Sequence, residues 1–426
     1  MKPRIRARAV LRGVMRTTVF ARFVLGIDRM VGVVALGLCR AAKGRPYEIC
    51  IVSAPGDGNI GDQALLESAL DRSAGARVIV FYSGSGEPLI PPRLKHNVDL
   101  APGRSLVYSI GIRRWIAMAR FVRRTRGVER TWVIGADTMD GAYNVLASIS
   151  RFSIARIAGS LGSDARVLGF SWNNAPARSA LLAAKMTEQR AHLLLRDPVS
   201  LERIRSQGIS SARGSSDLVF ARVGGDPLDH EAAAWVRERM ARGRRIALVN
   251  ASALLSGVVD QAPEYELIVA SLLSCGWSVV FVPHVCRPGN SDLDELDRIR
   301  PCGGENDIFR VRDLLEPDQV ASLASSASLV VTGRMHLAVL AILGSTYPIT
   351  LASQGKVEGL YKYLGRADLC IRPAPGFGTE VVERISALDS GGWLNRRIPL
   401  QTVDELRSMA RKSFNNSGQV SSRLRN

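Results

Sequence analysis

An arginine and a histidine stand two residues apart at a junction where an apolar strand is expected to give way to a helix. The segment Leu329–Val339 reads Leu-Val-Val-Thr-Gly-Arg-Met-His-Leu-Ala-Val, which places Arg334 and His336 at the carboxyl end of the strand. A guanidinium group binds carboxylate or phosphate through two parallel hydrogen bonds, and an imidazole transfers protons near neutral pH. The pattern therefore predicts anion binding and proton transfer, although His336 taken alone is equally compatible with a buried structural role.

A glycine-rich loop offers a second place for an anion. Residues 54–64 read Ala-Pro-Gly-Asp-Gly-Asn-Ile-Gly-Asp-Gln-Ala, and they follow an apolar strand and open a helix. Glycines permit tight turns and a close approach of backbone to ligand, and the free N–H groups of a helix N-terminus attract anions. The loop is neither a Walker motif nor a strict GxGxxG motif. An ordinary strand-to-helix turn with Asp62 as N-cap is the alternative interpretation, and the spacing does not decide between the two.

The elements that must position these segments alternate between strands and helices in two series. The first series is expected to contain strands at 49–54, 78–82, 131–134, 166–170 and 193–195, with a helix at 62–70. The second is expected to contain strands at 246–250, 278–282, 308–311 and 329–332, with helices at 265–275 and 293–299. Such alternation indicates parallel sheets covered by helices, whose ligands bind beyond the carboxyl ends of the strands. We therefore predict an α/β protein with two Rossmann-like domains facing a cleft.

Length and composition support this organisation. The chain has 426 residues, which suits two domains, and its 46% apolar and 23% charged residues exclude a disordered chain. The six cysteines show no CxxC spacing, which argues against a structural zinc site and favours a reducing compartment. We predict no metal site. The predicted segments are a basic amphipathic extension at 1–45, an N-terminal domain at 46–228, a C-terminal domain at 229–390, and a C-terminal helix with a polar tail at 391–426.

Positive charge is concentrated near the N-terminus. The chain carries a formal net charge of +18, and residues 1–45 contain eleven Lys or Arg residues against one acid, Asp28. Their apolar run Val31–Cys39 is too short to supply the about 20 residues that span a bilayer. A basic helix lying on anionic lipid and a solvated extension are both compatible with this tract. A second arginine cluster occupies 113–130, and the chain shows no nucleic-acid-binding module, so nucleic acid is not an expected partner.

The two chemistry-bearing segments also carry a family resemblance. Asn-Ile-Gly-Asp-x-Ala at 59–64 and Thr-Gly-Arg-Met-His at 332–336 together resemble the polysaccharide pyruvyl transferase family. Shorter matches lie between and after them in the same order, namely Ile134–Asp137, Gly169–Ser171, Leu195–Asp197 with Ser200 and Gly208, Ser216–Asp217, Pro283–His284 and Gly355–Lys356. The resemblance covers about residues 46–375. One departure is Ala136, where members of the family often have a second glycine.

The resemblance implies a fold similar to the GT-B glycosyltransferases and the transfer of a pyruvyl group from phosphoenolpyruvate to a sugar as a ketal. Phosphoenolpyruvate would be a donor substrate, and no cofactor is implied. The acceptor would be a saccharide of a cell-surface glycan such as an exopolysaccharide, or its lipid-linked precursor. Such a transferase would be cytoplasmic. The basic N-terminal tract adds the expectation of peripheral contact with anionic lipid on the inner face of the plasma membrane.

The groups expected to bind the donor follow from its two anionic parts. Phosphoenolpyruvate carries a carboxylate and a phosphate, so its site requires cations and exposed backbone N–H groups. The candidate cations are Arg196, Arg334 and Lys356. The other candidate contacts to substrate are Gly58, Asn59, Gly61 and Asp137.

Ketal formation also requires an acid for the enol methylene and a base for the sugar hydroxyl. His336 is the first candidate acid, and His284, at the end of a predicted strand, is the second. Asp62, Asp137 and Asp140 are the candidate bases, with Asp62 retaining its alternative role as a helix cap.

Two other functions compete with this interpretation. A nucleotide-sugar-dependent glycosyltransferase of the same fold would need an acidic ribose-binding residue in the C-terminal domain, and none is evident. A non-catalytic, membrane-associated relative is the other alternative, and the presence of both Arg334 and His336 argues against it. The acceptor sugar, the regiochemistry of the ketal and the oligomeric state stay open at this stage.

Overall fold

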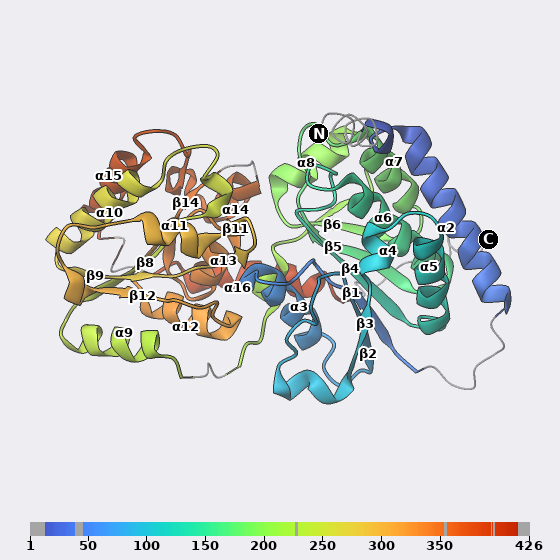
Figure 1. The fold of residues 1–426 in the computed structure, drawn as a ribbon, viewed down its shortest axis with the longest axis horizontal. Coiled ribbons are helices and arrows are strands. Elements are labelled where there is room, and N and C mark those ends of the chain that lie inside the picture. The colour runs from blue at the N-terminus through green and yellow to red at the C-terminus, as the bar shows by residue number, and fades with distance from the viewer. Residues whose placement is uncertain are drawn as a thin grey trace. The chain divides into compact units, whose positions relative to one another are not determined.

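The chain folds into two compact units, each built around a parallel sheet (Figure 1). The computed structural model describes residues 13–38, 46–225, 229–352, 356–392, 394 and 397–415. Within these residues, unit 1 contains the chain up to Pro55, Leu65–Arg222 and the chain from Leu406, and unit 2 contains Gly56–Ala64 and Val223–Glu405. Each unit is described by itself below.

Unit 1 is centred on a sheet that, among its described residues, has seven strands, all paired in parallel. In sheet order these are β3 (Val98–Pro102), β2 (Val78–Tyr82), β1 (Ile49–Val52), β4 (Arg130–Ala136), β5 (Asp164–Phe170), β6 (His192–Leu195) and β7 (Arg213–Gly214). The four residues of β1 are Ile-Cys-Ile-Val and all are buried, as expected for a parallel strand with helices on both faces.

The helices of unit 1 cover this sheet (Figure 1). The α-helices are α2 (Thr18–Leu38), α3 (Ile60–Asp71), α4 (Arg104–Tyr108), α5 (Ile112–Arg124), α6 (Val145–Ser160), α7 (Arg178–Thr187) and α8 (Pro198–Ser206), and the 3₁₀ turns are η1 (Pro92–Asn97) and η2 (Leu218–Ala221). The first residues of α3, Ile60–Ala64, belong to unit 2. Asp197 caps α8, because its carboxylate accepts hydrogen bonds from the backbone N–H of Ser200 at 2.7 Å and from its hydroxyl at 2.6 Å.

Unit 2 has a second parallel sheet, with six strands in the part of the chain that the structure describes. In sheet order they are β12 (Ile308–Arg310), β9 (Trp277–Phe281), β8 (Arg245–Asn250), β13 (Leu329–Thr332), β14 (Tyr347–Leu351) and β15 (Cys370–Ile371). A short antiparallel hairpin is formed by β10 (Cys286–Arg287) and β11 (Asn290–Ser291). The α-helices are α9 (Glu231–Ala241), α10 (Ala262–Ser274), α11 (Asp292–Arg298), α12 (Pro317–Ser326), α13 (Met335–Leu343), α14 (Lys356–Leu364) and α15 (Phe377–Ser390), and the 3₁₀ turns are η3 (Ala253–Leu255), η4 (Glu305–Asp307) and η5 (Ala367–Leu369). The last helix, α16 (Leu400–Lys412), begins in unit 2 and passes into unit 1 at Leu406.

Both sheets have a point at which the strand order reverses. In unit 1 the chain runs from β1 outward to β3 and then returns to β4 on the other side of β1; in unit 2 it runs from β8 outward to β12 and returns to β13. Ligands of open α/β sheets bind beyond the carboxyl ends of the strands at such a reversal. In unit 2 that position is occupied by the residues that follow β8, β9 and β13.

The compact units divide the chain differently from the predicted segments. Helix α2 is part of unit 1 instead of a separate extension, Gly56–Ala64 belongs with unit 2, and the chain from Leu406 returns to unit 1. That return is fixed by polar and aromatic contacts. The hydroxyl of Ser216 donates to the carbonyl of Leu406 at 2.6 Å, and Phe414 packs edge-on against Trp132 with 5.0 Å between ring centroids.

Helix α2 is attached to unit 1 by a buried ion pair. Asp28 on α2 is 1% exposed, and its carboxylate accepts hydrogen bonds from Nε of Arg114 at 3.0 Å and from the Ser153 hydroxyl at 2.6 Å. Arg114, on α5, also donates to the Ser150 hydroxyl at 2.6 Å. Because a buried charge without its partner is strongly destabilising, this network fixes α2 against α5 and α6. The rest of the predicted 1–45 tract, residues 1–12 and 39–45, lies outside the described residues.

Candidate functional site

The loop after β1 adopts a backbone that requires glycine. Gly56, Asp57 and Gly58 have φ angles of +72°, +31° and +63°, in the left-handed region that side chains disfavour. A Cβ atom on Gly58 would also lie 3.1 Å from the carbonyl carbon of Cys286 and closer still to its oxygen. The loop therefore approaches the β10–β11 hairpin too closely for any other residue at position 58.

Backbone hydrogen bonds hold this loop within unit 2. The N–H of Cys286 donates to the carbonyl of Gly58 at 2.8 Å, Asn59 forms an antiparallel bridge with Val285, and the N–H of Ile60 donates to the carbonyl of His284 at 3.1 Å. These pairings place the start of α3 beside the residues that follow β9. The predicted site residues Gly58, Asn59 and His284 are thus brought together.

Asn59 and Asp62 have different roles from those expected of a simple turn. The side-chain oxygen of Asn59 accepts the N–H of Gly61 at 3.0 Å, which satisfies a free donor at the start of α3. Asp62 therefore does not serve as the N-cap. Its buried carboxylate instead pairs with Arg287, whose Nη2 lies 3.0 Å from Oδ2. Arg287 also donates through Nε to the carbonyl of Asp57 at 2.5 Å, so it fastens the loop to the hairpin.

His336 lies directly against the backbone of Gly61. It is the second residue of α13 and is 9% exposed. A Cβ atom added to Gly61 would lie 2.6 Å from Cγ and 2.8 Å from Cβ of His336, against 3.4–4 Å for ordinary contact. The two segments that resemble the family motifs, 59–64 and 332–336, therefore meet through this glycine and this imidazole.

Arg334 is held by a carboxylate that the sequence analysis did not single out. It is the N-cap residue of α13, and its guanidinium donates to Asp292 through Nε at 3.1 Å and through Nη2 at 2.5 Å. Nη2 also donates to the side-chain oxygen of Asn290 at 3.0 Å. Among the described residues, Nη1 makes no hydrogen bond. The structure thus presents a fixed, largely neutralised guanidinium with one nitrogen left over.

Asp292 joins the ends of three strands. It is fully buried and accepts hydrogen bonds from the N–H groups of Ala253 at 3.0 Å, His284 at 3.1 Å and Val285 at 3.0 Å. The side-chain amide of Asn250, at the end of β8, also donates to it at 3.0 Å. A buried carboxylate needs this many donors to offset the loss of hydration. Its role could not be predicted from the sequence, because the groups that donate to it come from other segments. Locally, the sequence shows only an aspartate at the start of a predicted helix.

His284 is a buried imidazole with unused hydrogen-bonding capacity. It is 1% exposed, and neither ring nitrogen has a hydrogen-bond partner among the residues that the structure describes. Burial, together with the nearby charges of His336 and Arg334, lowers the pKa of His284 well below its usual value of 6.5. The ring is therefore neutral at physiological pH, with one N–H donor and one acceptor nitrogen. Since buried polar groups are normally paired, these nitrogens are suited to a ligand.

The predicted residues Arg196 and Asp137 meet in unit 1. Arg196 is buried and pairs with Asp137 through Nη2 and with Asp217 through Nη1 at 3.3 Å, and Nε donates to the Ser171 hydroxyl at 2.8 Å. Burial would lower the pKa of Arg196, but the carboxylates of Asp137, Asp217 and Asp197 outweigh it and raise the pKa. The guanidinium is therefore neutralised internally, which is a different environment from the donor-binding cation predicted for it.

The remaining predicted residues are placed as follows. Asp140 accepts the N–H of Ala142 at 2.9 Å and the side-chain amide of Asn173 at 2.7 Å, in unit 1. Lys356 begins α14, and its side chain lies outside the described residues. No group of three or more His, Cys, Asp or Glu side chains that could hold a metal ion occurs in the described part of the chain.

Ala136, where members of the family often have a glycine, has an unusual backbone conformation. Ala136, at the end of β4, has a φ angle of +46°, which favours glycine. At the preceding residue, a Cβ atom on Gly135 would lie 2.6 Å from Cβ of Phe170. The glycine that members of the family often have at position 136 would thus relieve strain that alanine accepts here.

Comparison with protein-family models matches residues 59–355, more than half of the chain, to the model described as polysaccharide pyruvyl transferase. A search of curated proteins finds no significant match.

Solved structures with a similar fold are enzymes of nucleotide-sugar chemistry. The Anabaena protein Alr3699/HepE in complex with UDP and glucose is 12% identical, with a TM-score of 0.52 over 86% of this chain and 94% of that one. A UDP-glucosyltransferase from Polygonum tinctorium is 13% identical, with a TM-score of 0.51 over 88% and 98%. The UDP-GlcNAc 2-epimerase from Methanocaldococcus jannaschii is 11% identical, with a TM-score of 0.50 over 79% and 91%. At these identities the likeness concerns the fold alone, and it confirms the α/β, GT-B-like architecture with two Rossmann-like domains.

Proposed function

Because the chain belongs to the polysaccharide pyruvyl transferase family, we propose that it transfers a pyruvyl group from phosphoenolpyruvate to two hydroxyl groups of a saccharide as a ketal. The acceptor is a sugar of a cell-surface glycan, such as an exopolysaccharide, or of its lipid-linked precursor. The observation that carries the proposal is the cluster of Arg334, His336 and His284 with the glycine loop, at the point of unit 2 where the strand order reverses.

The proposed reaction needs a proton donor and two hydroxyl nucleophiles. The methylene carbon of phosphoenolpyruvate takes up a proton, one sugar hydroxyl attacks C2, the bond from C2 to the phosphate oxygen breaks, and the second hydroxyl attacks C2. One hydroxyl proton replaces the proton that the acid delivered, and the other leaves with inorganic phosphate. Atoms and charge balance without a cofactor.

His336 is the proposed general acid. Its ring is fixed between the start of α13 and the backbone of Gly61, and a positioned imidazole contributes about 10²–10⁴-fold to such a proton transfer. His284 is assigned a binding role instead. Its lowered pKa keeps the ring neutral, so it has no imidazolium proton to deliver, but it can still donate and accept hydrogen bonds.

Arg334 is the proposed anion contact. Asp292 and Asn290 orient its guanidinium, and Nη1 is left for a donor oxygen at the N-terminus of α13, where the backbone N–H groups also favour an anion. Asp62 is the proposed base for the sugar hydroxyl, and its pairing with Arg287 fixes the position of its buried carboxylate.

The test is turnover by the purified full-length chain. It is incubated with phosphoenolpyruvate and either free or lipid-linked oligosaccharides, and the products are examined for the mass gain of a pyruvyl ketal and for released phosphate. His336→Ala provides the site variant, and His96→Ala, which removes an exposed histidine of η1, is its matched control. Parallel reactions with UDP-sugars test the glycosyltransferase alternative. Sugar transfer from a UDP-sugar with no ketal from phosphoenolpyruvate would overturn the proposal.

A further inference from the structure

Helix α2 presents an apolar stripe to solvent opposite the face that it buries. Its buried face includes Ala21, Leu25 and Asp28. With 3.6 residues per turn, Val19, Phe23, Met30 and Val33 fall on the opposite face, and their side chains are 61–73% exposed. A helix with apolar residues on both faces normally has a second surface to cover it. The contacts of α2 within the described residues account for one face only.

The neighbouring helix α5 continues this surface with alternating apolar and basic residues. Ile112 and Ile116 are 66% and 47% exposed, and Arg123 lies on the same face two turns further along. Arg113, Arg120 and Arg124 form the adjacent row. Since α2 packs on α5 and is pinned to it by the Asp28–Arg114 pair, the exposed faces of the two helices are parts of one rigid surface.

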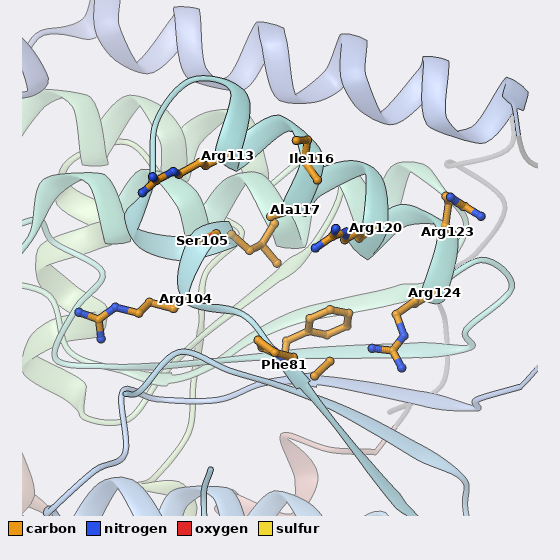
Figure 2. A pocket seen from close by; sticks show the side chains of 12 residues that line it. Phe81, Arg104, Ser105, Arg113, Ile116, Ala117, Arg120, Arg123 and Arg124 are labelled. Atoms are coloured by element: carbon orange, nitrogen blue, oxygen red, sulfur yellow. The ribbon is translucent and has the colours of Figure 1, made fainter. Parts of the chain in front are cut away.

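A cavity of about 660 Å³ opens beside this row of arginines. Its lining side chains come from β2, β3, α4 and α5, and Figure 2 shows the arginines of α4 and α5 around it, with α2 running alongside α5. The arginines that line it are Arg104, Arg113, Arg120, Arg123 and Arg124, and its described lining contains no Asp or Glu. Its floor is apolar, since Phe81, Ala101 and Leu106 are buried there. The cavity is therefore a pocket with a cationic rim and an apolar floor.

Most of the positive charges around this pocket have no neutralising partner among the described residues. The side chains of Arg104, Arg113, Arg120 and Arg123 form no hydrogen bond or ion pair with any described residue, in contrast to the paired arginines of the two sites above. Several like charges around one hollow raise the local potential and attract anions. A ligand with a phosphate and an adjoining hydrocarbon part fits both the rim and the floor.

We propose that α2 and α5 form a docking surface for an anionic lipid bilayer, and that the arginine pocket takes the phosphate of a lipid headgroup. Arginines interleaved with exposed aliphatic side chains are typical of helices that lie in the membrane interface. A nucleic acid or an acidic protein would satisfy the arginines but would leave the stripe of Val19, Phe23, Met30 and Val33 against a polar partner. None of the described helices has the combination of length and apolar composition that crossing a bilayer requires.

The experiment is co-sedimentation of the full-length chain with vesicles. Vesicles of phosphatidylcholine and phosphatidylglycerol in a two-to-one ratio are compared with vesicles of phosphatidylcholine alone, at low and high salt. The intact chain sediments with the anionic vesicles, less so at high salt, and stays in solution with the neutral ones. Failure to sediment with the anionic vesicles overturns the proposal.

Two sets of substitutions locate the contact. Changing Arg113, Arg120 and Arg123 to Gln weakens the vesicle partition coefficient by on the order of 100-fold, since each surface arginine contributes about a factor of five. Changing Phe23 and Met30 to Ser weakens it about tenfold or more, because their apolar surface no longer enters the interface. All these side chains are exposed, so thermal unfolding of the variants serves to show that the fold is intact.

The matched control removes three exposed arginines elsewhere, Arg213, Arg372 and Arg411, and keeps most of the binding. Equal losses in the two arginine triples would reduce the effect to net charge and refute the proposal. Competition by free glycerol phosphate, with no effect of the Phe23 and Met30 substitutions, would make the pocket an anion site alone and would also refute it. Binding of an RNA in place of vesicles is a further refuting outcome.

Discussion

Replacing Gly61 with alanine is the sharpest test of the candidate site, because the structure fixes what the added methyl group meets. The new Cβ atom would lie 2.6 Å from Cγ and 2.8 Å from Cβ of His336, where ordinary contacts are 3.4–4 Å. The imidazole must therefore move by about 1 Å, and misplacement of a catalytic group by about 1 Å can cost about 10²-fold in turnover. Overpacking of this kind also costs about 1–3 kcal/mol of unfolding free energy.

The assay is a double-mutant cycle with two readouts. Ketal formation and equilibrium unfolding are measured for Gly61→Ala, His336→Ala and the double variant. If the methyl group acts through the imidazole, adding Gly61→Ala to His336→Ala costs little further turnover, since the ring is already absent. Part of the unfolding cost persists in the double variant, because Cβ of residue 336 remains 2.8 Å from the added methyl group. Gly257→Ala is the matched control, because nothing lies within 4 Å of its added Cβ atom. Strictly additive effects on turnover, or normal turnover of Gly61→Ala, would refute the contact between Gly61 and the His336 ring.

Three further expectations concern the side chains around this contact. His336→Ala slows turnover by about 10²–10⁴-fold with donor affinity largely retained, and His336→Gln is nearly as slow; single-turnover kinetics and calorimetry separate the two effects. Arg334→Lys weakens donor binding and also lowers the unfolding free energy by about 1–3 kcal/mol, because Asp292 loses its two-pronged partner; denaturant titration measures the second effect. The pKa of His284 is lowered in the folded state, so below about pH 6.5 the unfolded chain binds a proton that the folded chain does not. The free energy of unfolding therefore decreases as the pH is lowered, by up to about 1.4 kcal/mol per pH unit, until the folded pKa is reached. His284→Gln removes this dependence, and thermal melts between neutral and mildly acidic pH measure it.

Most of the strands that the sequence predicts are buried, although the one predicted at 308–311 became the half-buried edge strand β12. The runs at 246–250 and 329–332 are continuous and apolar, and they became β8 and β13 at the centre of the second sheet. Among the strands that were not predicted, the two longest are β3 and β14. The strand β3 lies at a sheet edge, and its sequence Val-Asp-Leu-Ala-Pro has no apolar run, while β14 contains Pro348. Pro348 is tolerated because β15 pairs with β14 only from Thr350 onward, so β14 has a free edge there.

Residues of the candidate site could be singled out from the sequence only where they lie together in one short segment. Arg334 and His336 were visible because they adjoin a strand and a helix in one short segment, and that local signal correctly marked the end of β13. Asp292 was not visible, since it lies 42 residues from Arg334 and acts only after β8, β9 and β13 have aligned their carboxyl ends. Arg196 stays a prediction. The family resemblance made it a candidate cation for the donor, and the structure adds that Asp137 and Asp217 pair with its guanidinium.

Two glycines of the loop are needed because other parts of unit 2 occupy the space that a side chain would fill. Gly58 admits the carbonyl of Cys286, which holds the loop on the hairpin, and Gly61 admits the ring of His336. A side chain at position 58 would separate the loop from the hairpin, and one at position 61 would displace the imidazole. The segments 59–64 and 332–336 are far apart in the sequence, yet they meet in the structure through Gly61 and His336. The chemistry assigned to His336 therefore depends as much on the absence of a methyl group at Gly61 as on the histidine itself.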